Sequence, residues 1–158
     1  MLKATNINKD TNFLEGSVIL FNKPLMWSSF DVVKKVRNII KLGKEIKKIK
    51  VGHAGTLDPL AGGLLIVCTG KFTKRIDEIQ DQKKVYSGEI TIGSTTPSYD
   101  KETEIDKTFD ISHITEEIIH SSCRKFEGII MQKPPIFSAL KREGKRLYRH
   151  AREGTKIE

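Results

Sequence analysis

One aspartate of this sequence lies where a reactive carboxylate would be expected. Asp58 is part of a loop of small residues that runs from Gly52 to Gly63 and reads GHAGTLDPLAGG. The four glycines of this loop allow the backbone to approach a ligand closely, while Pro59 biases Asp58 towards an extended conformation. The loop leads directly into an apolar run, so we expect it to be rigid and to hold a positioned carboxylate.

Two other interpretations could explain the same loop. A phosphate-binding loop would need G-x-x-x-x-G-K-[ST], but Leu65 occupies the place of the first glycine and Phe72 follows Gly70-Lys71. The sequence therefore excludes that motif. The remaining alternative is a turn without chemistry, which is the commoner use of an isolated Asp-Pro pair in a glycine-rich loop.

Neither metal binding nor export is indicated. The two cysteines, Cys68 and Cys123, form no C-x-x-C pair, and no histidine spacing suits zinc. We expect both to be buried free thiols in the cytoplasm.

Residues 1–15 are polar, lack the apolar core of an export signal and are predicted to form a flexible tail. No apolar run approaches the roughly 20 residues that cross a bilayer, so no membrane contact is expected.

The elements that must position the loop follow from hydrophobic periodicity. Ser28 or Ser29 is suited to begin an amphipathic helix whose apolar face includes Val33, Val36 and Ile40. Further helices are expected at 71–80 and 116–126, and strands at 17–21, 64–68 and 83–92. This mixture predicts an α+β domain with a mixed, largely antiparallel sheet flanked by helices, rather than a strict βαβ series.

The charge of the chain favours a polyanionic partner. There are 28 Lys and Arg against 20 Asp and Glu, which gives a net charge of +8. Contacts from such residues release counterions from phosphates. A solvated, lysine-rich surface fits the net charge equally well, but clustering favours nucleic acid. The basic residues gather in a linker (Lys41, Lys44, Lys47, Lys48, Lys50) and near the C-terminus (Lys141, Arg142, Lys145, Arg146, Arg149, Arg152).

Four segments of the sequence together resemble the TruB-type pseudouridine synthases of bacteria. GHAGTLDPLAGG closely matches the signature loop of that family. Gly16 to Ser29 resembles its first motif, and Lys83 to Tyr86 resembles its lysine- and tyrosine-bearing strand. Pro134 to Lys141, with Gly144 to Tyr148, resembles a later motif that grips RNA. Because the four occur in family order over most of the chain, the sequence is identified as a member of this family.

The resemblance implies the pseudouridine synthase fold and its activity. Members of the family isomerise a uridine in the T-arm loop of tRNA, at position 55 in tRNA numbering, to pseudouridine without a cofactor or metal. The uracil is detached from its ribose, turned and rejoined through a carbon atom. The base must therefore be flipped out of the folded loop. The implied partner is the tRNA T-arm stem-loop, and the implied full-length enzyme is a cytoplasmic monomer.

The resemblance also assigns roles to single residues. Asp58 takes the place of the catalytic nucleophile, and a carboxylate needs no general base to activate it. Attack on the sugar, attack on the base and deprotonation of the sugar all stay open as its route. Tyr86 takes the place of a tyrosine that stacks on the flipped uracil. His53 takes that of a residue which fills the space left by the base. By residue type alone, Tyr86 would more often be a core aromatic and His53 an exposed loop residue.

Three basic residues complete the expected site. Lys23, with Pro24, resembles a motif that supports the active-site loop, so its implied role is structural. Lys141 and Arg146 belong to the segment that resembles the RNA-gripping motif, where basic and aromatic residues suit phosphate contact and stacking. An amphipathic helix with a solvated basic face is the alternative for that segment.

The resemblance ends before the pattern of the family is complete. A later strand of the family carries a Lys-Gly-Thr-Tyr-Ile-Arg type motif whose arginine pairs with the catalytic aspartate, and no such motif occurs here. An enclosed carboxylate without a cation or donors has a large desolvation cost. We therefore expect residues 16–158 to be the N-terminal portion of the catalytic domain, incomplete at the C-terminus and without any C-terminal RNA-binding domain. Truncation is favoured over a split enzyme, and the isolated chain is expected to have little or no activity.

Two alternative functions stay open. One is a non-catalytic module that binds the T-loop of tRNA or assists its folding. The other is the related guide-RNA-dependent synthase of archaea and eukaryotes, which modifies ribosomal RNA. Leu60-Ala61-Gly62 and Trp27-Ser28-Ser29 look more bacterial and argue against it. Activity on bare tRNA would separate the two synthases.

Overall fold

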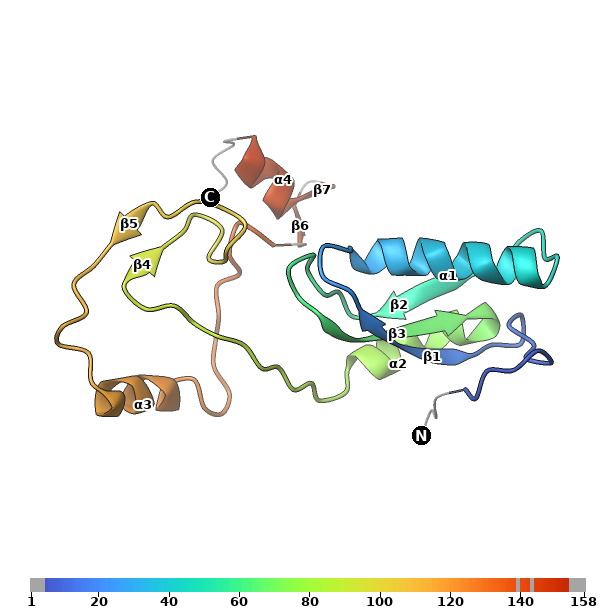
Figure 1. The fold of residues 1–158 in the computed structure, drawn as a ribbon, viewed down its shortest axis with the longest axis horizontal. Coiled ribbons are helices and arrows are strands. Elements are labelled where there is room, and N and C mark those ends of the chain that lie inside the picture. Colours follow the sequence, from blue (N-terminus) through green and yellow to red (C-terminus); the bar gives the residue numbers. More distant parts are fainter. Residues whose placement is uncertain (1–4, 139, 143, 154–158) are drawn as a thin grey trace. The chain divides into compact units, whose positions relative to one another are not determined.

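The computed structural model describes residues 5–138, 140–142 and 144–153, with only the backbone of Lys141, Arg142 and Arg152. The chain divides after Gly88 into two compact units (Figure 1). The elements of the first are β1 (Val18–Lys23), α1 (Ser29–Gly43), β2 (Val51–Ala54), β3 (Gly63–Thr69), the 3-10 helix η1 (Gly70–Arg75) and α2 (Ile76–Gln80). Those of the second are β4 (Ser94–Thr95), β5 (Lys107–Thr108), α3 (Glu116–Arg124), β6 (Lys141–Arg142), β7 (Lys145–Arg146) and α4 (Leu147–Arg152).

A three-stranded antiparallel sheet in the order β1-β3-β2 forms the centre of the first unit. Lys23 at the end of β1 pairs with Gly63 at the start of β3, and Ala54 at the end of β2 pairs with Ile66. The end of β1, the end of β2 and the start of β3 therefore lie at one end of the sheet (Figure 1). The turn that follows β1 and the loop at 55–62 emerge there together.

Helix α1 covers one face of this sheet (Figure 1). Ser28 is its N-cap and forms a capping box with Asp31, which decides between Ser28 and Ser29 as the first cap. The apolar stripe of the helix is buried against the strands, as its periodicity predicted. The core on this face contains Val32, Val33, Val36 and Ile40 of α1 with Ile19, Val51, Leu65 and Val67 of the sheet.

A smaller core occupies part of the other face of the sheet. Ile79 of α2 is buried with Val18 and Cys68. Burial raises the pKa of the Cys68 thiol, in line with the expectation of a buried cysteine at this position. The sheet is thus covered by helices from both sides over part of its length.

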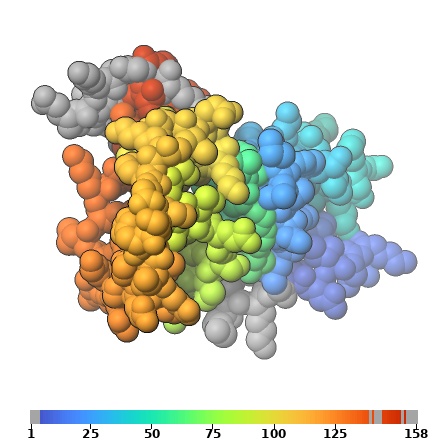
Figure 2. Space-filling model, turned by 60° about the vertical axis from the view of Figure 1, so that its left-hand side comes forward, coloured from blue at the N-terminus to red at the C-terminus, as the bar shows by residue number. Residues whose placement is uncertain are grey.

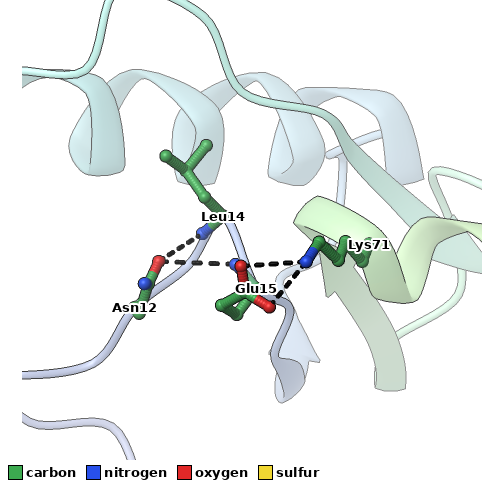
Figure 3. A network of polar contacts seen from close by, with 4 residues as sticks. All are labelled: Asn12, Leu14, Glu15 and Lys71. Carbon is green, nitrogen blue, oxygen red and sulfur yellow. Dashed lines mark hydrogen bonds and ion pairs between the residues drawn. The ribbon is translucent and has the colours of Figure 1, made fainter.

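The segment before β1, expected to be a flexible tail, is attached to the first unit at both of its described ends: Thr5 exchanges two hydrogen bonds with the backbone of Val18, and residues 12–15 contact the core and η1. Phe13 is buried in the cluster that α1 forms with the sheet. Figure 3 shows the polar contacts next to it: the Asn12 side chain accepts hydrogen bonds from two following backbone N–H groups, and the Glu15 carboxylate pairs with Lys71 at 2.8 Å. These contacts attach residues 12–15 to the start of η1.

The strand expected at 83–92 does not form in the described part of the chain. These residues pair with no other strand there, and the side chains of Val85, Tyr86 and Ile90 are largely exposed. Their alternation of apolar and polar residues is typical of a strand, but a strand also needs a neighbour whose backbone supplies hydrogen-bond partners. The prediction of a half-buried strand was therefore wrong for this structure.

The second unit consists of short elements joined by loops. β4 pairs with β5, and β6 pairs with β7, each as a two-residue antiparallel ladder. Thr115 caps α3, because its hydroxyl accepts a hydrogen bond from the backbone N–H of Ile118. This helix nevertheless buries no residue. Cys123 on α3 is exposed, so the prediction that both cysteines are buried was wrong for this one.

Antiparallel sheets combined with separate helices confirm the predicted α+β class. Within the described residues, no helix is long and apolar enough to cross a membrane. The same residues hold no cluster of three or more His, Cys, Asp or Glu side chains that could bind a metal ion.

Candidate active site

The loop between β2 and β3 presents Asp58 at the surface of the first unit. Its backbone carbonyl accepts a hydrogen bond from the N–H of Ala61 at 3.0 Å. This bond closes a four-residue turn with Pro59 at the second position, where proline is favoured. The Asp58 side chain is exposed. Among the described residues its carboxylate has no hydrogen-bond or ion-pair partner, so it is open to a ligand.

The backbone on the N-terminal side of Asp58 is held by a serine of α1. Ser29 is buried, and its hydroxyl donates to the Leu57 carbonyl at 3.0 Å and accepts from the Leu57 N–H at 2.9 Å. The Leu57 side chain packs against the core under α1. Because both backbone groups and the side chain of Leu57 are fixed, the residue that precedes Asp58 has little freedom to move.

Loss of the Ser29 hydroxyl should therefore destabilise the first unit. We expect Ser29→Ala to lower the free energy of unfolding by about 1–2 kcal/mol, because the Leu57 N–H loses its acceptor. Urea denaturation followed by the fluorescence of Trp27, the only tryptophan of the chain, measures the change. Thr56→Ala removes an exposed hydroxyl of the same loop and is the control. Equal losses in both variants would contradict the role of Ser29.

The backbone on the C-terminal side of Asp58 is held by the turn after β1. Lys23 is only 1% exposed. Its ammonium group donates to the carbonyl of Trp27 at 2.6 Å, to that of Pro24 at 3.0 Å and, at the limit of a hydrogen bond, to that of Pro59 at 3.5 Å. The backbone N–H of Met26 donates to the same Pro59 carbonyl at 2.7 Å.

Met26, whose N–H donates to the Pro59 carbonyl, has an unfavourable backbone conformation. Its φ angle is 66°, in the left-handed region that costs an ordinary side chain roughly 1–2 kcal/mol. Strain of this kind persists where the surrounding contacts determine the conformation. Asp58 is thus flanked by Leu57 and Pro59, each bonded to a separate part of the first unit, so the backbone that carries its carboxylate is held in place.

Asp58 and Tyr86 line one open cavity of about 550 Å³. Its walls come from the loop and from the segment after α2: Thr56, Leu57, Asp58, Leu60, Ala61, Gly62, Tyr86 and Ser87. The Tyr86 side chain is 72% exposed, so its ring is available for stacking. The structure therefore brings together the two residues that the family resemblance assigned to the nucleophile and to the stacking tyrosine.

The remaining predicted residues occupy different places. His53 lies in β2, opposite Val67, and its Nδ1 is 2.6 Å from the Gly55 carbonyl. It is half-buried and does not line the Asp58 cavity. Arg146 is an exposed residue of β7 in the second unit. The side chain of Lys141 lies outside the described part of the structure.

Sequence reasoning missed Ser29, Leu57 and Met26 as supports of the loop. Two adjacent serines before the helix were a usable signal, since only one residue can be the N-cap. With Ser28 as the cap, the hydroxyl of Ser29 is free to bond elsewhere. No comparable signal pointed to Met26, because its role rests on one backbone bond to a residue more than thirty positions away.

Comparison with known proteins places the loop in a known family. The sequence matches the model described as "TruB family pseudouridylate synthase (N terminal domain)" over residues 41–158. A relative from Flavobacterium johnsoniae, named tRNA pseudouridine synthase B, is 60% identical over 148 residues, which cover 92% of this chain and 64% of the relative.

Two further relatives bear the same name. The protein from Phocaeicola vulgatus is 55% identical over 93% of this chain and 63% of its own length. The protein from Chloroherpeton thalassium is 52% identical over 90% of this chain and 58% of its own length. The chain therefore spans less than two thirds of each of these relatives.

Proposed function

The chain belongs to the TruB family of pseudouridylate synthases, and on this premise we propose that it carries the nucleophile of a tRNA-modifying isomerase. The proposed substrate is the T-arm stem-loop of tRNA, with position 55 as the modified uridine. The reaction breaks the bond between ribose C1′ and uracil N1, joins C1′ to C5, releases the proton from C5 to solvent and adds one proton from solvent to N1. Asp58 is the proposed nucleophile, and no metal or cofactor takes part.

The observation that carries this proposal is the double attachment of the Asp58 loop. Ser29 holds Leu57 on one side, and Lys23 with Met26 holds Pro59 on the other. A catalytic carboxylate has to be held close to its productive geometry, and buried groups that fix its neighbours achieve this. A turn with only a structural role would not require both a buried lysine, Lys23, and a strained residue, Met26, bonded to the Pro59 carbonyl.

The cavity next to Asp58 suits a base that has left its stack. A uridine in a folded T-loop must be flipped before its ring atoms can be reached, which costs a few kcal/mol of stacking energy. In our proposal Tyr86 offsets part of this cost by stacking on the uracil. Lys23 acts by positioning the loop, Lys141 and Arg146 contact RNA phosphates, and His53 occupies the place of the displaced base.

We further propose that residues 1–158 alone do not turn over substrate. In the described residues the Asp58 carboxylate has no cationic partner. A negative charge that becomes enclosed by bound RNA needs a donor or cation to compensate for lost water. The experiments below use a fusion enzyme, in which this chain replaces the matching segment of the Flavobacterium johnsoniae relative. In our proposal the remaining part of that relative supplies the missing donor or cation.

Release of tritium from 5-tritiated uridine in a T-arm stem-loop tests both statements. We expect turnover with the fusion enzyme and none above background with residues 1–158. Turnover by the isolated chain would contradict the second statement. Binding of the stem-loop by the fusion enzyme without tritium release would favour a non-catalytic T-loop module instead.

A further inference from the structure

A second hollow lies on the surface of the first unit, outside the Asp58 cavity. We call it the Trp27 groove; it measures about 360 Å³ and is lined by Met26, Trp27, Asp31, Lys34, Lys35 and Asn38. Positions separated by three or four residues lie on one side of a helix. The helical members of the groove therefore share a side of α1 that faces away from its buried stripe. Figure 2 shows the surface of α1, coloured blue to cyan, with its side chains projecting outwards.

The groove is positively charged. Lys34 and Lys35 are exposed and form no ion pair with any described residue. The only acid of the groove, Asp31, is already engaged: its carboxylate accepts from the Ser28 hydroxyl at 2.6 Å and from the Ser28 N–H at 2.9 Å. These bonds, and to a smaller degree the charge of Lys34, lower the pKa of Asp31. Asp31 therefore stays negatively charged, and the two lysines outnumber it, which leaves the groove with a net positive charge for an anionic ligand.

The groove also contains an aromatic ring. Trp27 is 39% exposed, and its backbone is fixed because its carbonyl accepts the 2.6 Å hydrogen bond from Lys23. The preceding residue, Met26, is bonded to Pro59 of the Asp58 loop. The groove therefore begins at the same turn that holds the proposed nucleophile. This shared turn is the observation that connects the groove with the Asp58 loop.

We propose that the Trp27 groove binds a second nucleotide of the RNA, with a base stacked on Trp27 and neighbouring phosphates on Lys34 and Lys35. This inference rests on the proposed RNA substrate. Proteins that hold unpaired nucleotides combine an aromatic platform with cations that follow the backbone, and stacking tolerates any base. A helix face that merely keeps the protein in solution needs lysines, but it needs no aromatic ring set in a hollow beside them.

The lone tryptophan makes the inference directly measurable. We expect a T-arm stem-loop RNA to quench the fluorescence of Trp27 in residues 1–158. The dissociation constant from this quenching should equal the one from the anisotropy of labelled RNA. Trp27→Ala should weaken binding about tenfold, whereas Trp27→Phe, which keeps a ring for stacking, should weaken it less. The second variant shows whether a smaller aromatic ring is enough for stacking.

A salt titration tests the lysines separately. Each phosphate contact contributes about 0.7–0.9 to the magnitude of the slope of log affinity against log salt concentration. The double variant Lys34→Ala, Lys35→Ala should therefore reduce the magnitude of this slope by roughly 1.5. Both changes place a good helix former on an exposed face, so the fold is preserved. Lys9→Ala with Lys74→Ala removes the same charge from exposed positions outside the groove, and we expect an unchanged slope.

Each outcome decides the inference. Quenching together with the reduced slope in the groove variant supports it. Binding that leaves Trp27 fluorescence unchanged, equal slopes in the groove and control variants, or no binding at all would overturn it. Failure of the proposed reaction is seen independently, because tritium release by the fusion enzyme can be absent while the quenching persists.

Discussion

Replacing Asp58 by alanine in the fusion enzyme should lower pseudouridine formation by about four orders of magnitude or more, the usual effect of removing a nucleophile. The loop backbone should keep its shape, because its hydrogen bonds to Ser29, Lys23 and Met26 do not involve the Asp58 side chain. Binding of the stem-loop should therefore survive. Single-turnover tritium release measures the chemical step, and anisotropy of labelled RNA measures binding.

The matched control for this variant is Asp10→Ala. Asp10 is also exposed and lies in the first unit, before β1 and outside the Asp58 cavity, so its loss should leave the rate within a factor of about two. Turnover that persists in Asp58→Ala at a rate similar to that of the control would show that another group is the nucleophile. A loss of both binding and turnover would instead point to a collapsed loop.

The largest effect on stability is expected at Lys23. Lys23→Ala should lower the free energy of unfolding of the first unit by about 3 kcal/mol, because it leaves a cavity and removes the donor of three backbone carbonyls. Part of the loss is offset, since the variant no longer has to bury an ammonium group. Urea denaturation of residues 1–158, followed by Trp27 fluorescence, reports on this unit directly.

Lys34→Ala provides the comparison, because it removes an exposed lysine of the same unit and should change stability by less than about 0.5 kcal/mol. If Lys23→Ala were as stable as this control, its hydrogen bonds would not hold the turn. In the fusion enzyme, Lys23→Ala should also reduce turnover while Asp58 is intact, because the Pro59 side of the loop becomes free.

Local signals predicted much of the first unit. The periodic apolar residues of α1, its serine cap and the apolar run of β3 all lie where the sequence placed them, because each depends on neighbours a few residues away. The turn at Asp58-Pro59 is equally local, since proline sets its own backbone angle. These features were sufficient to predict a positioned aspartate before the strand β3, whereas the preceding strand β2 (Val51–Ala54) was not predicted.

The supports of the Asp58 loop could not be predicted in the same way. Ser29 and Leu57 lie 28 positions apart, and Lys23 and Pro59 lie 36 apart. They meet only because β1 pairs with β3 in a register that puts Lys23 opposite Gly63. A single sequence does not state that register, so the contacts that hold the loop follow from the fold alone.

Two predicted elements also show the limit of periodicity. Residues 83–92 alternate between apolar and polar side chains as a strand does, yet within the described structure they pair with no strand. Helix α3 is amphipathic, yet none of its residues is buried. Periodicity indicates which face of an element can be buried, but burial requires a partner surface. Exposed Cys123 on α3 has the same cause.

The most direct test of the central claim is to map pseudouridine in an unmodified tRNA transcript after incubation with the fusion enzyme. We expect one modified uridine, at position 55 of the T-arm loop, and none when the fusion enzyme carries Asp58→Ala. Modification at other positions only, or modification that persists without Asp58, would contradict the claim that this aspartate isomerises the T-loop uridine.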